Sequence, residues 1–203
     1  MKAPLIVLVS LLVASAAVYF GSFLLPDSYE VRRSIVVNAK PEKVFPYLNN
    51  PTKWEEWNAW NKTYDPTMIR LYGGPLTGKG AYQEWNGDKV GMVKVHFTDS
   101  TPPTELYYKQ LTKGEEFETI GIFSLEPLED GTRVVWQQRT RVADDIYNRY
   151  RGFFKKLKTE QETEQSLVSL KTLLEPVSKA ESKLRLANKK ATARYSSGLL
   201  PVL

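Results

Sequence analysis

The chain has 203 residues, enough for one domain with its own hydrophobic core and short flanking segments. It contains no cysteine and one histidine, which excludes disulfides and leaves a transition-metal site without its usual ligands. The formal net charge is +5, but residues 178–203, with six basic residues and one acidic residue, carry this whole excess. Residues 1–177 are therefore neutral overall, and the sequence predicts no nucleic-acid-binding surface.

Residues 4–25 form an uncharged, largely apolar segment. About 20 apolar residues span the hydrocarbon core of a bilayer, so this segment is predicted to be a transmembrane anchor. The alternative is a cleavable signal peptide, with Lys2 before the apolar core and an A-x-A-like site at residues 14–16. The anchor is favoured because the apolar run continues past that site to Leu25. A single amino-terminal anchor then predicts a single-pass protein of the cell membrane, with its soluble domain on the extracytoplasmic side.

Residues 27–177 are predicted to form the domain, and its first part is rich in strands. Seven segments have the alternation or the β-branched and aromatic content of strands, and turn residues separate them. They are residues 31–37, 66–72, 79–85, 89–98, 104–111, 115–126 and 132–141. Short connections such as Asn86-Gly87 predict an antiparallel meander.

From Asp144 onward the apolar residues recur at helical spacing. Asp144 or Asp145 is expected to cap the start of this helical region. A break is expected near residues 151–152, and an amphipathic helix is predicted over residues 160–175. Its apolar stripe needs a partner, which the sheet supplies.

Four motifs occur in one order along the domain. They are Ser34-Ile35 with Val37, Ala39, Pro41, Val44 and Phe45; Trp54, Trp57 and Trp60; Gly78, Gly80, Trp85 and Gly87; and Gly131, Thr132, Val134 and Trp136. In this order they resemble the SRPBCC superfamily, also called START-like or helix-grip, and most closely its polyketide cyclase/dehydrase-like branch. Ala59 departs from the family, which has proline there. The resemblance covers about residues 29–177.

The resemblance implies an α+β helix-grip (START/Bet v 1-like) fold. A curved antiparallel sheet of about seven strands would surround a long carboxy-terminal helix, with one transmembrane helix before it. Folds of this family commonly leave an apolar cavity between sheet and helix, which implies binding of a hydrophobic or lipid-like small molecule. The alternative is a cyclase or dehydratase acting on a polyketide-like or aromatic ligand. Binding is preferred because the candidate acid–base groups Glu84, Glu105 and Tyr107 have no identifiable partner.

Strand parity and the aromatic content supply candidate ligand-binding residues. They are Trp57, Trp60, Gln83, Trp85, Phe123, Trp136, Gln138 and Thr140. For each aromatic ring the alternative is a purely structural place in the core. Gln138 and Thr140 are the most suggestive, because a sealed core disfavours unpaired polar groups beside Trp136. No catalytic residue, metal site or cofactor is predicted.

Three other features receive structural interpretations. His96 has the parity opposite to the apolar residues of its strand and is predicted to face solvent. The glycine-rich run 73–80 precedes no helix and lacks the Lys-Ser/Thr of a phosphate-binding loop, so it is predicted to connect strands. The basic tail 178–203 is either a membrane-surface segment or a solvated extension of the last helix, and the second is favoured. The protein is expected to be a monomer.

Overall fold

The structure is a computed structural model that describes residues 2–113, 117–142 and 145–175. Within these residues, seven strands form one antiparallel sheet in the order β1-β7-β6-β5-β4-β3-β2. The strands are β1 (Ser28–Val37), β2 (Ile69–Gly73), β3 (Tyr82–Gly87), β4 (Gly91–Thr101), β5 (Glu105–Thr112), β6 (Glu118–Leu128) and β7 (Gly131–Arg141). All seven predicted strands are confirmed, with ends shifted by a few residues, and so is the meander. The predictions for Asp144 and for the basic tail lie outside the described residues.

Alternation along the strands divides the sheet into an inner and an outer face. On β4, Val93, Val95 and Phe97 are buried, whereas His96 is exposed, as predicted. On β7 the side chains of Trp136 and its same-parity neighbours are buried and the arginines of the opposite parity are exposed. The inner face therefore carries the core, together with polar side chains such as Gln138 and Thr140.

Short helices close one end of the sheet. They are α2 (Pro41–Leu48), the 3-10 turn η1 (Pro51–Lys53) and α3 (Trp54–Trp57). Pro41 begins α2 where no intrahelical hydrogen bond is lost, and the Asn50 side chain caps η1 by accepting from the Thr52 N–H at 2.9 Å. Both tryptophans of α3 are fully buried. They bring large aromatic rings onto the inner face of the sheet.

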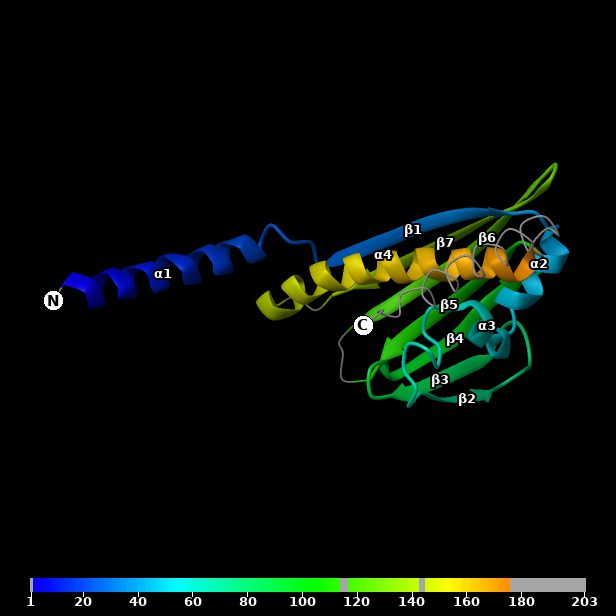
Figure 1. Ribbon diagram of the computed structural model, residues 1–203, viewed down its shortest axis with the longest axis horizontal. Coiled ribbons are helices and arrows are strands. Elements are labelled where there is room, and N and C mark those ends of the chain that lie inside the picture. The colour runs from blue at the N-terminus through cyan, green and yellow to red at the C-terminus, as the bar shows by residue number, and fades with distance from the viewer. Residues whose placement is uncertain (1, 114–116, 143–144, 176–203) are drawn as a thin grey trace, which may run out of the picture.

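The long helix α4 (Ile146–Leu174) crosses the inner face of the sheet beside β1 (Figure 1). Asp145 caps it, because its Oδ1 accepts from the Asn148 N–H at 2.9 Å. The predicted break near residues 151–152 is wrong: α4 is continuous for 29 residues. Gly152 is buried, and a Cβ there would lie 2.8 Å from a Val142 methyl carbon. This glycine therefore permits close approach of helix and sheet and does not end the helix.

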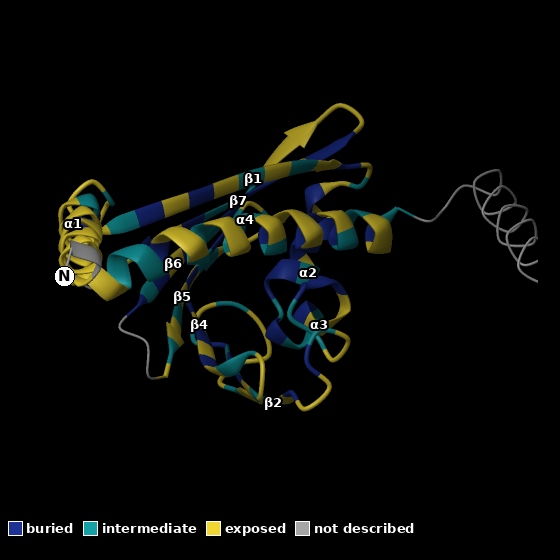
Figure 2. Ribbon diagram, turned by 60° about the vertical axis from the view of Figure 1, so that its left-hand side comes forward, coloured by how far each residue is buried: buried dark blue, intermediate teal, exposed yellow. Residues whose placement is uncertain are grey.

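The apolar helix α1 (Lys2–Ser22) extends away from the domain (Figure 1). Its residues Pro4–Ser22 are long and apolar enough to cross a membrane, a property that signal sequences share. The carboxyl end of α1 contacts the start of α4, where the Tyr150 hydroxyl donates to the Val18 carbonyl oxygen at 3.0 Å. Figure 2 shows α1 exposed over most of its length, in contrast to the buried inner face of the sheet, and residues 4–20 are all exposed.

Candidate ligand-binding site

A cavity of ≈ 40 Å³ lies between α4 and the inner face of the sheet. Its apolar wall consists of four tryptophans, Trp54, Trp60, Trp85 and Trp136. A water molecule needs at least about 10–15 Å³ of such space, whereas pockets for small organic ligands measure about 300–1,000 Å³. The cavity therefore has a volume suited to a few water molecules.

Five of the eight candidate residues line this cavity: Trp60, Trp85, Trp136, Gln138 and Thr140. The other three, Trp57, Gln83 and Phe123, are fully buried in the adjoining core and do not line it. Trp57 packs with its ring centroid 5.8 Å from that of Trp136, and Gln83 accepts a hydrogen bond from the Trp85 indole at 2.9 Å. Strand parity thus predicted which side chains point to the inner face of the sheet, but not which of them border the cavity beneath α4.

A chain of hydrogen bonds links the sheet to α4 across the cavity. The Trp136 indole donates to the Tyr108 hydroxyl at 2.8 Å, and this hydroxyl donates to Gln138 Oε1 at 3.3 Å. Gln138 Nε2 then donates to Thr163 Oγ1 at 2.7 Å. Burial raises the pKa of Tyr108, while the hydrogen bond from Trp136 opposes the rise. Tyr108 therefore remains neutral and keeps the proton that it donates to Gln138.

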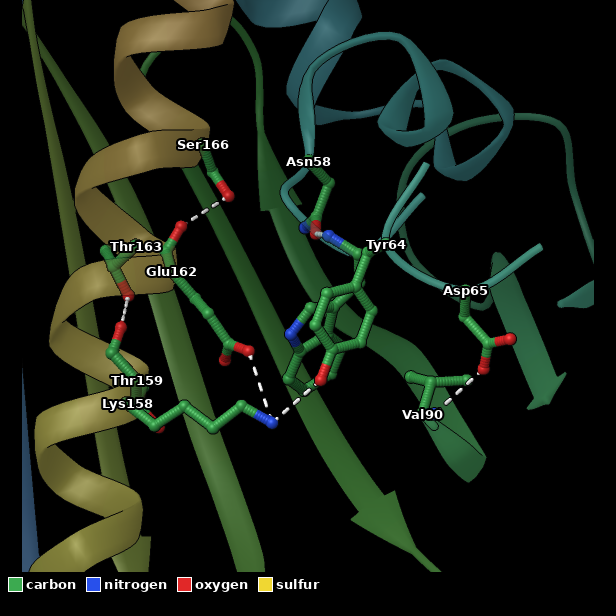
Figure 3. A network of polar contacts seen from close by, with 10 residues as sticks. Asn58, Tyr64, Asp65, Val90, Lys158, Thr159, Glu162, Thr163 and Ser166 are labelled. Atoms are coloured by element: carbon green, nitrogen blue, oxygen red, sulfur yellow. Dashed lines mark hydrogen bonds and ion pairs between the residues drawn. The ribbon is translucent and has the colours of Figure 1, made fainter. Parts of the chain in front are cut away.

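Glu162 on α4 is a cavity residue that the sequence analysis missed. Figure 3 shows its carboxyl pointing from α4 toward Lys158 and Tyr64. Its Oε1 lies 3.6 Å from Lys158 Nζ but has no hydrogen-bond partner. Burial raises the pKa of Glu162, and a hydrogen bond with the Trp60 side chain and the charge of Lys158 oppose the rise. A desolvated carboxyl group is thus present at the cavity wall.

A second hollow, of ≈ 380 Å³, lies on the outer side of this wall, between residues 59–64 and α4. Trp60 and Glu162 line both this hollow and the inner cavity. On the outer side, Lys158 Nζ donates to the Tyr64 hydroxyl at 2.9 Å (Figure 3). The side chains of Trp60 and Glu162 therefore lie between the small inner cavity and a larger space of ligand dimensions.

Asp65 fixes the loop that carries Trp60 and Tyr64. Its carboxylate accepts from the backbone N–H groups of Lys89 at 2.8 Å and Val90 at 3.0 Å, and from Thr67 (Figure 3). These hydrogen bonds lower the pKa of Asp65 to about 2, and the one from the Thr67 hydroxyl has the largest effect on it. One end of the loop is therefore tied to the β3–β4 turn at neutral pH.

A family model described as "Polyketide cyclase / dehydrase and lipid transport" matches residues 28–175, the whole sheet and α4. The chain belongs to this SRPBCC-type family. The resemblance of its four motifs is thereby confirmed, as is the helix-grip fold. A search of the curated proteins finds no match to the sequence.

Solved structures share the fold of this polyketide cyclase-family chain. Protein CV1439 from Chromobacterium violaceum is 20% identical with a TM-score of 0.50, and the match covers 75% of this chain and 99% of that one. An uncharacterized protein from Rhizobium leguminosarum is 18% identical with a TM-score of 0.55, over 72% and 94% of the chains. The di-domain ARO/CYC protein BexL, from the BE-7585A biosynthetic pathway, is 13% identical with a TM-score of 0.53, over 73% and 50%. At these identities the likeness concerns the fold alone.

The acid–base candidates weighed from the sequence lie outside the cavity of this cyclase-family domain. Glu84 forms an ion pair with Lys94 at 2.7 Å, and Glu105 accepts from the Tyr107 hydroxyl at 2.9 Å. None of these side chains lines the cavity. Within the part of the chain that the structure describes, no group of three or more His, Asp or Glu side chains is arranged to hold a metal ion.

Replacing Glu162 by glutamine is expected to stabilise the domain at pH 7 and to have less effect at pH 4. Because burial raises the pKa of Glu162 above its ordinary 4.5, the folded protein retains a proton that the unfolded chain releases. The stability of the natural protein therefore falls as the pH rises from about 4.5 through the folded-state pKa of Glu162. The glutamine variant lacks this loss of stability, because glutamine does not titrate. The lost ion pair with Lys158 is a weak opposing effect, since Lys158 is largely exposed.

Thermal unfolding followed from pH 4 to pH 8 measures this effect. Glu164→Gln is the matched control, because Glu164 is exposed on the same helix. Identical pH profiles for the two variants would contradict the assignment of a desolvated carboxyl to Glu162.

Proposed function

We propose that this protein is a membrane-tethered binding protein for a hydrophobic or lipid-like small molecule, held between the sheet and α4. The observation that carries the proposal is the cavity itself, in which four tryptophans and Tyr29 face ten residues with hydrogen-bonding or charged side chains. Ligand sites likewise combine aromatic surface with placed polar groups that orient the ligand. The family description, which includes lipid transport, supports the same class of ligand.

A ligand enters this site only if the wall between the two hollows opens. The inner cavity of ≈ 40 Å³ is too small for a lipid or an aromatic polyketide, but the outer hollow of ≈ 380 Å³ adjoins it at Trp60 and Glu162. Moving these two side chains joins the spaces into one of ligand size. Trp60 is only half-buried, and its ring meets that of Trp85 edge-on at 5.2 Å, which favours it as the moving part.

Gln138→Leu is expected to weaken binding of a neutral aromatic probe, N-phenyl-1-naphthylamine, by about tenfold, equivalent to about 1.4 kcal/mol. Gln138 lines the cavity and links Tyr108 to Thr163, and leucine keeps its approximate size but donates no hydrogen bond. The fold is expected to persist, because Thr163 still donates to the Thr159 carbonyl oxygen. Fluorescence titration measures the dissociation constant, and circular dichroism checks the fold.

Gln137→Leu is the control, since Gln137 is the next residue of β7 and bonds to Glu30 on the outer side of the sheet. Equal weakening by both variants, or no probe binding by the natural protein, would count against a ligand site at Gln138.

A cyclase or dehydratase is the second candidate function, and Glu162 is the observation that favours it. A carboxyl with a raised pKa at the edge of an apolar cavity is suited to proton transfer at near-neutral pH. Binding remains the preferred function because most polar groups on the sheet side of the cavity, including Gln110, Gln138 and Thr140, do not titrate. An acid–base reaction needs a second titratable group placed for proton transfer, and the candidates in the lining are Tyr29 and Lys155.

The anchor makes a separate prediction. Membranes washed with carbonate are expected to retain the full-length chain, and mass spectrometry is expected to find residues 4–25 still attached. The reason is that α1 has the length and composition to span the bilayer. Deletion of residues 1–26 is expected to give a soluble, folded domain, because the core lies in the sheet and α4. A soluble mature chain that begins near Ala17 would identify a signal peptide.

With the anchor in place, the proposed location is the cell membrane, with the domain on the extracytoplasmic side. Protease added to intact cells is expected to degrade the domain, and protection until the cells are lysed would reverse this orientation.

A further inference from the structure

The first half of α4, residues 146–158, exposes a stripe of large apolar side chains. This aromatic stripe consists of Ile146, Tyr147, Phe153, Phe154 and Leu157. Spacings of seven and of three or four residues place them along one side of the helix. Tyr147 is 69% exposed and Phe154 65%, values that leave most of each ring without a contact inside the domain. Contiguous apolar surface of this kind marks a contact site.

The charged side chains within residues 146–158 have one sign. This segment contains five basic side chains, Arg149, Arg151, Lys155, Lys156 and Lys158, and no acidic one, although Lys158 also pairs with Glu162. The Arg151 guanidinium lies 5.7 Å from the Tyr147 ring centroid, so charge and aromatic surface are interleaved. A partner for this surface must accept apolar rings and carry negative charge.

The aromatic stripe continues onto the end of α1. The Tyr150 hydroxyl donates to the Val18 carbonyl oxygen, and the Arg149 guanidinium lies 5.8 Å from the Phe23 ring centroid. Phe23 belongs to an exposed aromatic group with Tyr19 and Phe20 at the same end of α1. Figure 1 shows the start of α4 beside this end of α1. Aromatic side chains gather at this level of a membrane protein, between hydrocarbon and water.

We infer that the aromatic stripe of α4 lies in the interfacial layer of an anionic bilayer, next to the point where α1 enters it. The inference rests on the anchor proposed above. Two other occupants are disfavoured by charge: a second copy would bring the same five basic residues, and residues 178–203 carry their own excess of +5. Anionic phospholipid satisfies both the apolar and the electrostatic requirement. The helix that covers the ligand cavity would then touch lipid directly, since Lys155 and Thr159 line that cavity.

The absence of cysteine permits a direct test with single labels on the full-length chain. Phe154→Cys carries an environment-sensitive fluorophore, and the protein is placed in nanodiscs whose lipids bear a nitroxide near the headgroup. Quenching at position 154 is expected to be several-fold stronger than for Leu173→Cys, which labels an exposed site at the far end of the same helix. The difference is expected to shrink when phosphatidylglycerol is replaced by phosphatidylcholine. Leu157→Cys provides a second site within the stripe.

Each contrary result has its own meaning. A chain retained in the discs with unquenched labels at 154 and 157 would overturn the lipid contact but not the anchor. Labels shielded from soluble iodide yet unquenched by lipid would also overturn it, because a second copy or residues 176–203 would then cover the stripe. A chain absent from the discs would overturn the anchor and the contact with it.

Discussion

Replacing Gly121 by alanine is expected to lower the free energy of unfolding by about 3 kcal/mol, as overpacking of a tight core does. A Cβ at Gly121 on β6 would collide with the ring of Tyr108 on the neighbouring strand β5. Tyr108 is fully buried and is held by its hydrogen bonds with Trp136 and Gln138. The ring therefore cannot turn away without breaking the chain of hydrogen bonds that links the sheet to α4.

Chemical denaturation of the natural protein and of the variant measures the change. Ile120→Ala is the control, because Ile120 precedes Gly121 on the same strand and is 45% exposed. Its effect is expected to be within about 0.5 kcal/mol, which is usual for surface positions. A Gly121→Ala variant as stable as this control would show that the Tyr108 ring can move aside for a methyl group, contrary to the structure.

Trp54→Ala is expected to cost about 4 kcal/mol, in the range for removing a large aromatic side chain from a core. Trp54 is fully buried, and its indole donates to the Leu48 carbonyl oxygen at 2.7 Å. Its ring lies 5.5 Å, between centroids, from the rings of Phe97 and Tyr108. Trp54 also lines the cavity, so its removal joins a void of indole size to the existing space.

That void gives the Trp54 variant a second measurable property. Added indole is expected to raise its melting temperature, because a ligand that binds only the folded state stabilises it. Leu170→Ala is the control, since it removes a buried aliphatic side chain and leaves a smaller space. Equal responses to indole in both variants would mean that the effect is unspecific and that Trp54 does not border the site.

The sequence was sufficient to predict the sheet because burial on one face forces a period of two. Val93, Val95 and Phe97 alternate with exposed or partly exposed residues on β4, and β1, β3 and β5 show a similar alternation. The break in α4 was predicted wrongly because glycine has low helix propensity, whereas Gly152 is retained for its contact with Val142. That contact joins α4 to the residue that follows β7, and no local pattern contains it.

The candidate site was only partly predictable for a related reason. Trp57 and Trp60 belong to the same aromatic motif, yet one is sealed in the core and the other is half-buried at the cavity wall. Their difference depends on where α4 crosses the sheet. Glu162 was missed because it lies in a polar stretch that resembles a solvated helix face, and its desolvation follows from packing near Trp60 and Tyr64. The available signal was helical spacing. Glu162 directly precedes Thr163 and lies four residues before Ser166, and both of these residues are buried against the sheet side of the helix.

If the proposed function holds, the small volume of the inner cavity would limit how fast a ligand can bind. A molecule larger than a few waters must wait until Trp60 and its loop, or α4 itself, move away from the sheet. The observed association rate would then rise with ligand concentration only up to a plateau, the rate of opening, and that plateau would be shared by ligands of different size. The apparent dissociation constant would likewise exceed the intrinsic one by the reciprocal of the open fraction. Substitutions at Trp60 would therefore change affinity through the frequency of opening as well as through any contact that its ring makes with the bound molecule.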